Sequence, residues 1–389
     1  MRPPPSAATP AFRPGSGMIL VGALAVSLIW LAGNQGGASL AIMAIIGLFA
    51  GLALYHASFG FTAGWRRFIL DRRSAGLRAQ LIMLGLASVF FFPALAAGDL
   101  FGQPVNGFVF PVGLALVLGA FLFGIGMQIG GGCGSGTLFT IGGGSLRMVV
   151  TLAFFVLGST LASASAEYWL FWPTLPAVSI LKELGWFSAL IGMLGALGGI
   201  YMLVSQAEQS RHGALAPINR LKSRWFTGPW SILAGAIALA LVNIAVLAVS
   251  GWPWGVTGAF ALWGAKIAAF FGSTPQSWLF FQGQHEALVA SVFADVTSVM
   301  DFGIVLGAMA AALLAGSFKP NFSIPLRSLL AAVIGGLLLG IGARLGTGCN
   351  IGAFFSGTVS GSLHGWAWLV FAFMGNVVGV RLRPLFRLD

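Results

Sequence analysis

Long apolar runs separated by short polar or basic segments dominate the chain. Runs long enough to cross a membrane, which takes about 20 helical residues, lie at 79–98, 105–127, 146–166, 184–206, 228–250, 297–316, 325–345 and 363–380. A further apolar stretch, MILVGALAVSLIWLAG, begins at Met18. Because many spans follow it, we predict a retained first helix rather than a cleaved secretory signal. The pattern predicts an all-α, polytopic integral membrane protein.

Composition supports this class and explains the net charge. Of all residues, 58% are hydrophobic and 7% are charged, and the mean hydropathy is +0.93. The formal charge of +11 gathers in segments such as 65–78 and 211–224, which lie between predicted spans. The positive-inside rule explains such segments as cytoplasmic loops, so we predict no nucleic-acid partner. The segments 167–183 and 273–296 carry almost no Arg or Lys, as expected of the periplasmic side.

These markers predict the organisation of the chain. We expect a cytoplasmic N-terminal arm at 1–17, a first membrane half at 18–210, a basic cytoplasmic linker at 211–227 and a second membrane half at 228–389. No soluble domain remains between the apolar runs. The predicted location is the inner (plasma) membrane of a bacterium, with the lipid bilayer as the constant partner.

The two cysteines of the chain stand in two similar glycine-rich loops. Cys133 lies in FGIGMQIGGGCGSGTLF and Cys349 in LGIGARLGTGCNIGAFF. Aligned without a gap, Gly119–Phe139 and Gly335–Phe355 are identical at ten of twenty-one positions. Self-similarity of this kind identifies an internal repeat.

The repeats are predicted to run in opposite directions through the membrane. If 66–78 is cytoplasmic, the run 105–127 leads inward to the Cys133 loop, whereas 325–345 leads outward to the Cys349 loop. A shared segment approached from opposite sides indicates an inverted repeat. We therefore predict two inverted, pseudo-symmetric halves whose broken helices meet at a central constriction.

The glycines of the loops suggest two roles. Gly at spacings of four, as in GIGMQIG and GIGARLG, allows close packing of membrane helices. The denser run GGGCGSG breaks a helix, and freed backbone groups at membrane depth are tolerated only inside protein or beside a water-filled cavity. Successive N–H groups bind anions, so we predict substrate contacts at Gly132, Gly134 and Gly348.

Four interpretations of the cysteines are open: small core residues, metal ligands, a disulfide and substrate contacts. Their equivalent placement in both repeats favours a shared role over incidental packing. A metal site usually needs more ligands than two cysteines, and neither loop contains His. A disulfide requires only that the loops meet. A thiol is a weak S–H donor, and we predict that Cys133 and Cys349 contact a sulfur-containing anion through it.

Several polar residues near the second loop have two readings each. Arg344, whose repeat counterpart is Gln128, attracts the anion or neutralises a helix C-terminus. Asn350 donates to substrate or caps the following helix. We interpret Lys266, Asp301 and His364 as interfacial or paired structural groups.

The sequence argues against catalysis by this chain. It shows no nucleotide-binding loop, paired catalytic carboxylates or metal-ligand cluster, so we expect no cofactor, no metal and no ATP-driven pumping. A sulfurtransferase would need a base or positive neighbour to activate a thiolate, and GGGCGSG supplies neither. A purely accessory subunit would not need broken helices. A transporter without catalytic residues is the prediction, with a membrane sulfurtransferase-type accessory protein as the alternative.

The doubled G-x-G-C-x-x-G motif in a glycine-rich membrane protein resembles the YeeE/YedE family, over about residues 40–380. The resemblance implies an hourglass-like fold with a waist where the repeats meet. It also implies that cysteines in the waist pass thiosulfate by hydrogen bonds from their thiols. Those cysteines correspond to Cys133 and Cys349. A cytoplasmic sulfur-carrier or sulfurtransferase protein is a further expected partner.

One departure from the family pattern concerns a third cysteine. The family commonly has S-x-F-C-F upstream of a basic residue, whereas this chain reads HASFGFTAGWRR, with Gly60 at the cysteine position. The difference predicts that the outermost relay step is missing, and it keeps open another sulfur or selenium species as the substrate. Simple helix packing is the alternative explanation of Gly60.

Overall fold

A computed structural model describes residues 14–219, 224–320 and 322–388. The predicted arm at 1–17 and linker at 211–227 therefore lie partly outside the described residues. Within the described part, nine helices or joined helices are long and apolar enough to cross a membrane. The chain is an all-α, multi-pass membrane protein, as predicted.

A long helix overlaps each of the eight apolar runs named above. The long helices are α1 (Pro14–Ala57), α3 (Ala75–Ala97), α4 (Leu114–Gly130), α6 (Leu146–Ala164), α9 (Trp186–His212), α10 (Ile232–Ser250), α13 (Val296–Leu314), α14 (Leu326–Leu345) and α16 (Leu363–Leu382). Only α4 begins much later than expected, because the chain from Val105 to Val112 has no regular structure.

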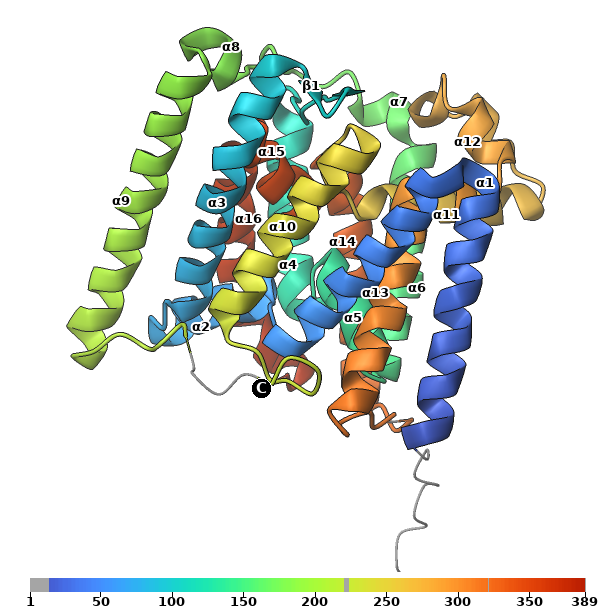
Figure 1. Cartoon of the computed structure of the whole chain (residues 1–389), viewed down its shortest axis with the longest axis horizontal. Helices are drawn as coiled ribbons and strands as arrows, with labels where there is room; N and C mark the ends of the chain where they lie inside the picture. Colours follow the sequence, from blue (N-terminus) through green and yellow to red (C-terminus); the bar gives the residue numbers. More distant parts are fainter. Residues whose placement is uncertain (1–13, 220–223, 321, 389) are drawn as a thin grey trace, which may run out of the picture.

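The first helix is in fact two helices. Gly36 and Gly37 have non-helical backbone angles, and Gly37 has φ 65° and ψ −155°, a conformation that residues with a Cβ atom rarely adopt. Figure 1 shows that α1 doubles back, so that its two parts run in opposite directions. Residues 38–57 thus form a crossing that was not among the apolar runs named from the sequence.

Five shorter elements lie among the long helices. They are α2 (Phe61–Asp71), α5 (Gly134–Gly142), α11 (Thr257–Phe270), the π-helical segment η4 (Asn350–Ser356) and α15 (Gly357–Val359). Each has fewer than the roughly 20 residues that a membrane-spanning helix needs. In the view of Figure 1, α5 and α15 lie within the outline of the bundle, among α4, α14 and α16.

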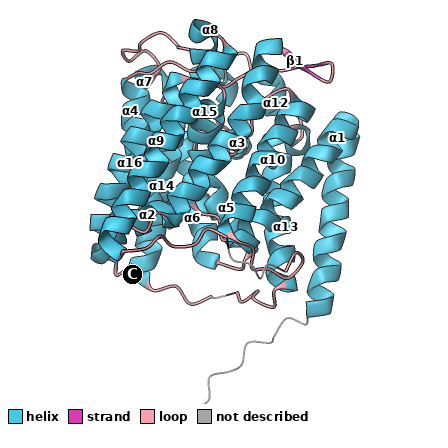
Figure 2. Cartoon of the chain, turned by 60° about the vertical axis from the view of Figure 1, so that its left-hand side comes forward, coloured by secondary structure: helices cyan, strands magenta, loops and turns pink. Residues whose placement is uncertain are grey.

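The remaining elements are small and lie toward the ends of the long helices. They are the hairpin β1 (Asp99–Leu100) and β2 (Gln103–Pro104), the helices α7 (Ala166–Trp169), α8 (Ile180–Leu184) and α12 (His285–Val289), and the 3₁₀ turns η1 (Pro275–Ser277), η2 (Leu279–Phe281), η3 (Val292–Ala294) and η5 (Arg383–Phe386). Figure 2 shows the loops gathered at the two ends of the helix bundle.

The two ends differ in charge. In Figure 1, α2 and the C-terminus lie at one end, and α7, α8, β1 and α12 lie at the other. The first end carries the basic segment 65–78 and the described residues 211–219, while the second carries 167–183 and 273–296. The positive-inside rule bears on which end faces the cytoplasm, and we call the two ends the α2 end and the α8 end below.

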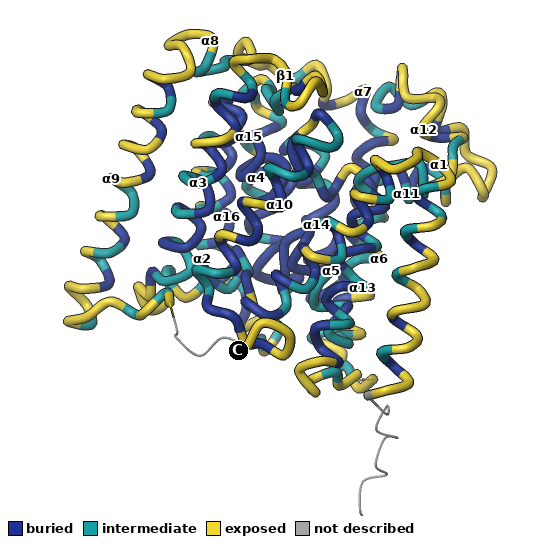
Figure 3. The backbone as a smooth tube through the Cα atoms, in the orientation of Figure 1, coloured by how far each residue is buried: buried dark blue, intermediate teal, exposed yellow. Residues whose placement is uncertain are grey.

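Helices α4 and α14 pack closely and antiparallel. Gly119 lies against Gly346, and Gly130 lies against Gly335. A Cβ atom added at Gly342 would lie 2.6 Å from the backbone nitrogen of Phe123. Helix α6 packs on α14, and α16 packs on α4. These glycines serve close helix packing, as the spacing of four predicted, and Figure 3 shows that burial is concentrated at this centre.

Two glycine substitutions test this packing. Gly342→Ala should destabilise the protein by about 1–3 kcal/mol, because the added methyl group meets rigid backbone. Gly192→Ala on α9 is the matched control, since no heavy atom lies within 4 Å of its added Cβ, and it should be neutral or stabilising by up to about 1 kcal/mol. Thermal unfolding of the purified proteins in detergent measures both. Equal midpoints for the two variants would contradict the packing account.

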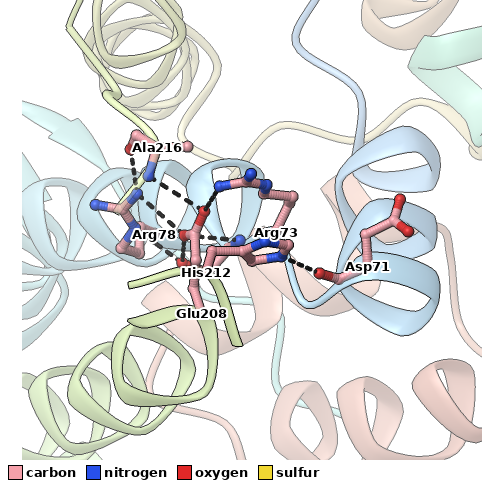
Figure 4. Close-up of polar contacts among 7 residues, drawn as sticks. Asp71, Arg73, Arg78, Glu208, His212 and Ala216 are labelled. Carbon is pink, nitrogen blue, oxygen red and sulfur yellow. Dashed lines mark hydrogen bonds and ion pairs between the residues drawn. The ribbon is translucent and has the colours of Figure 1, made fainter. Parts of the chain in front are cut away.

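Helix α9 lies at the edge of the bundle and packs on α3. Glu208, near its C-terminus, is fully buried. Its carboxylate accepts hydrogen bonds from Ser74 Oγ at 2.5 Å, Ser74 N at 3.1 Å and Ala216 N at 3.1 Å, and forms ion pairs with Arg73 at 3.3 Å and Arg78 at 3.4 Å. Figure 4 shows this cluster, which ties α9 to the turn between α2 and α3.

Candidate functional site

Each cysteine stands where a helix breaks and a shorter element begins. Gly131, with φ 96°, ends α4, and Cys133 caps α5, with its Sγ accepting from Gly136 N at 3.4 Å. Cys349 precedes η4 and follows Thr347 and Gly348, whose φ angles are 61° and 147°. Both side chains are buried, with 1% of Cys133 and 0% of Cys349 exposed.

The two glycine-cysteine loops are in contact. A Cβ atom added at Gly134 would lie only 3.2 Å from Cys349 Sγ. Both cysteines are free thiols, so no disulfide joins the loops. Among the residues that the structure describes, no group of three or more His, Cys, Asp or Glu could hold a metal ion.

The predicted glycines also have a local steric reason. A Cβ atom at Gly132 would lie 3.0 Å from Thr137 N, and one at Gly348 would lie 2.9 Å from Ala353 N. In each loop the chain thus folds tightly against the first turn of the following element. Glycine allows the backbone to lie close to that turn, which is a packing reason for these residues. The predicted substrate contacts of Gly132, Gly134 and Gly348 are therefore proposals.

Unpartnered buried polar atoms occur around the second loop. Among the described residues, those without a hydrogen-bond partner include Arg344 Nε, Thr347 Oγ1, both side-chain amide atoms of Asn350, Thr358 Oγ1 and His364 Nε2. Buried polar groups are normally hydrogen-bonded, so this region is suited to a polar ligand. Because neither amide atom of Asn350 has a hydrogen-bond partner within the described chain, its side chain does not cap η4, and that interpretation was wrong.

Arg344 and its repeat counterpart Gln128 make comparable contacts. Arg344 Nη2 donates to the carbonyl of Thr257, the first residue of α11, at 2.6 Å. Gln128 Nε2 donates to the carbonyl of Thr62, the second residue of α2, at 3.1 Å. The Arg344 guanidinium also lies 5.5 Å from the centre of the Phe280 ring. Each side chain holds the start of a short helix in place.

The segment from Trp254 to Thr257, which was not predicted from the sequence, also contacts the loops. A Cβ atom at Gly134 would lie 3.2 Å from both Val256 Cγ1 and Thr257 Cγ2. The motif WPWG between two apolar runs was the available signal, because Pro and Gly punctuate helices.

The side chains of Asn243 and Ser356 hold the segment at Trp254 in place. Trp254 N donates to Asn243 Oδ1 at 2.8 Å, and Ser356 Oγ donates to Trp254 O at 2.7 Å. The Phe61 ring at the start of α2 also packs edge-on against Phe354. The starts of α2, α5, α11 and η4 therefore meet in one buried region.

Comparison with known proteins identifies the family. A sequence model described as "Sulphur transport" matches residues 56–378. This chain belongs to the sulphur transport family. It is 33% identical over 171 residues to the probable transporter YedE of Escherichia coli, covering 43% of this chain and 42% of YedE. The match thus spans less than half the length of that relative.

Two relatives in the sulphur transport family match over a longer range. The thiosulfate transporter TsuA of Spirochaeta thermophila is 27% identical over 356 residues, covering 85% of this chain and 95% of TsuA. The thiosulfate transporter TsuA of Escherichia coli is 25% identical over 350 residues, covering 85% of this chain and 91% of that protein. The resemblance to YeeE/YedE proteins seen in the sequence is confirmed.

Gly60 has space around it in this member of the sulphur transport family. It precedes α2 in an extended conformation, and the nearest atom to an added Cβ, that of Ala63, lies 3.9 Å away. Helix packing therefore does not require glycine here. A Cβ atom has room at this position.

Three charged or titratable residues set aside in the sequence analysis differ in their contacts. Lys266 donates to the carbonyls of Leu288 at 2.7 Å and Ala290 at 2.6 Å, as a structural group would. His364 is buried, and its Nδ1 contacts Ser362 Oγ at 2.7 Å. Asp301 is fully buried, and neither carboxyl oxygen has a hydrogen-bond partner among the described residues. The prediction that Asp301 is interfacial or paired was wrong.

Proposed function

We propose that this chain imports thiosulfate or a closely related sulfur-containing anion through a constriction formed by the two glycine-cysteine loops. The observation that carries the proposal is the contact between the loops, with Gly134 placed against Cys349 Sγ. The family supports sulfur transport, and the two TsuA relatives support thiosulfate as the substrate. A selenium or other sulfur species is the alternative cargo.

The proposed architecture is an inverted repeat. Gly119 and Gly130 of the first repeat are equivalent to Gly335 and Gly346 of the second. The contact of Gly119 with Gly346 and that of Gly335 with Gly130 therefore exchange when the repeats are exchanged. The antiparallel packing of α4 and α14 fits a two-fold axis in the membrane plane. This reciprocity supports two halves, at about 18–210 and 228–389, that meet at the constriction.

In the proposed mechanism the protonated thiols act as hydrogen-bond donors. The anion enters from the periplasmic end, contacts Cys133 and Cys349 in turn, and leaves at the cytoplasmic end without covalent chemistry. Backbone N–H groups of Gly132, Gly134 and Gly348 and the amide of Asn350 provide further donors. Weak donors suit conduction, because the anion must bind strongly enough to enter and weakly enough to leave.

The proposed setting is the inner membrane of a bacterium. The basic segments at the α2 end favour a cytoplasmic location for that end, where an imported sulfur anion must be consumed. A cytoplasmic sulfur-carrier or sulfurtransferase protein is the proposed consumer. This chain itself is proposed to be a transporter without enzymatic activity.

Growth and uptake experiments test the substrate. A sulfur-auxotrophic bacterium that lacks its own importers would express this chain with thiosulfate, sulfate, sulfite or selenite offered separately. We expect uptake and growth with thiosulfate to exceed those with the other anions. Equal uptake of all four, or preference for sulfate, would contradict the proposal.

Arg344 provides a prediction about anion attraction. Arg344→Gln should raise the KM for thiosulfate on the order of tenfold, because hydrogen bonds to charged groups contribute about 1.5–3 kcal/mol. Arg327→Gln, at the exposed start of α14, is the matched control and should leave KM unchanged. Arg344 also has a structural role, because it donates to the carbonyl of Thr257. Thermal unfolding measures that role separately from anion binding. A lowered melting temperature with unchanged KM would show that Arg344 is structural only.

A further inference from the structure

Asp301 is a carboxyl group buried within a membrane-spanning helix. It lies near the start of α13, which is one of the candidate spans. The residue is 0% exposed, and among the described residues both oxygens are without a hydrogen-bond partner. A carboxylate in this setting is very costly, whereas the protonated acid is much less so. Ionisable residues inside membranes are rare and commonly mark ion or proton pathways.

The face of α13 that carries Asp301 packs on α5. Residues 301, 305 and 308 share one face of the helix, because they are spaced by four and three. A Cβ atom at Gly142 would lie 2.7 Å from Ala308 Cβ, so this face packs on α5, the helix that Cys133 caps. The opposite contact of α13, through Gly303, is with Gly47 of α1.

The titratable groups around Asp301 are few. Its carboxyl group interacts electrostatically with Cys349 and with Asp295. Asp295 caps α13 by accepting from Ser298 N at 2.7 Å. Of the elements that pack against α13, η3 and α5 contain no charged residue. The titratable residues of α1 among those described are Tyr55 and His56, at its far end. Helix α11 contributes Lys266, which interacts with Asp295. No cation is paired with Asp301 in the described part of the chain.

We propose that Asp301 binds a proton that is imported together with the anion. This inference rests on the proposed function. In the proposed step a carboxylate oxygen of Asp301 takes a proton from the periplasmic side, the anion binds at the loops, and both leave to the cytoplasm. No bond of the anion is broken.

Electrostatics links the two ligands. A carboxylate beside the constriction repels an anion, whereas the protonated acid does not. By linkage, a proton on Asp301 must therefore favour anion binding, and the bound anion must favour protonation to the same degree. Alternate loading and release of both would allow a pH gradient to drive accumulation of the anion.

Proteoliposomes containing the purified full chain test the proposal. Radioactive thiosulfate is offered with the outside acidic and the potential held at zero, and a trapped dye reports internal pH. We expect at least tenfold accumulation that requires the pH gradient, together with acidification of the lumen. Asp301→Asn should abolish gradient-driven accumulation and acidification, and its thiosulfate exchange should no longer vary with external pH between 5 and 8. Asp295→Asn is the matched control and should retain coupling.

Each remaining outcome decides against the proposal. Gradient-driven accumulation with acidification by Asp301→Asn would overturn it. So would net uptake of thiosulfate by the unmodified chain without any proton uptake, a result that needs no variant and leaves the proposed transport function intact. Absence of exchange by the unmodified chain at any pH would instead overturn both the transport function and the coupling.

Discussion

Replacing both cysteines by alanine is expected to lower thiosulfate uptake by about a hundredfold or more. Cys133 and Cys349 are buried free thiols in two loops that are in contact. Removing one donor in a dry constriction costs about 1.5–3 kcal/mol when the partner is charged, which corresponds to roughly ten- to a hundredfold per cysteine. Initial rates of radioactive thiosulfate uptake, normalised to protein in the membrane, measure the effect.

Serine and a distant alanine variant make this test specific. Cys→Ser at either position should rescue uptake only partly, because the shorter hydroxyl has a different reach. Ser159→Ala removes a buried hydroxyl from α6 and should leave uptake unchanged. If the double alanine variant is present in the membrane and transports at the parental rate, the cysteines are packing residues.

Removing the carboxylate of Glu208 is expected to produce the largest loss of stability. Arg78 has 5% of its side chain exposed and would be left without its ion-pair partner. Breaking a buried pair costs about 3–5 kcal/mol, whereas the pair with Arg73, which is 44% exposed, contributes little. Glu208→Gln should therefore lower the thermal midpoint and speed proteolysis of the segment after His212, because α9 loses its attachment at the α2 end.

The control for Glu208 is an exposed acidic residue near the opposite end of α9. Glu183→Gln changes an exposed carboxylate of α8, next to the other end of α9, and should leave both measurements unchanged. A Glu208→Gln variant with the parental melting temperature and cleavage rate would show that the cluster in Figure 4 does not hold α9.

Much of the fold follows from the apolar runs. A spanning helix needs a long uninterrupted apolar stretch, so α3, α6 and α16 could be predicted within a few residues. The break at Gly36 and Gly37 was harder, because two glycines in a long apolar region also fit a continuous, closely packed helix. The backbone angles of Gly36 and Gly37 show that the chain turns there.

The candidate site could be predicted where the sequence repeats itself. The doubled motif led to Cys133 and Cys349 without a structure. The segment around Trp254 and Thr257 was not found, because nothing local shows that it folds back against Gly134. Asp301 was misjudged for a similar reason. A single acid in an apolar run is consistent with a paired group, and only the tertiary contacts show that no partner among the described residues meets it.

A structure determined with thiosulfate bound tests the central claim most directly. Anomalous scattering from sulfur would locate the anion relative to Cys133 and Cys349. The proposal predicts the anion between the two loops, within hydrogen-bonding distance of at least one thiol and of backbone N–H groups from the glycines beside it. An anion held elsewhere, with both thiols packed only against protein, would contradict the account.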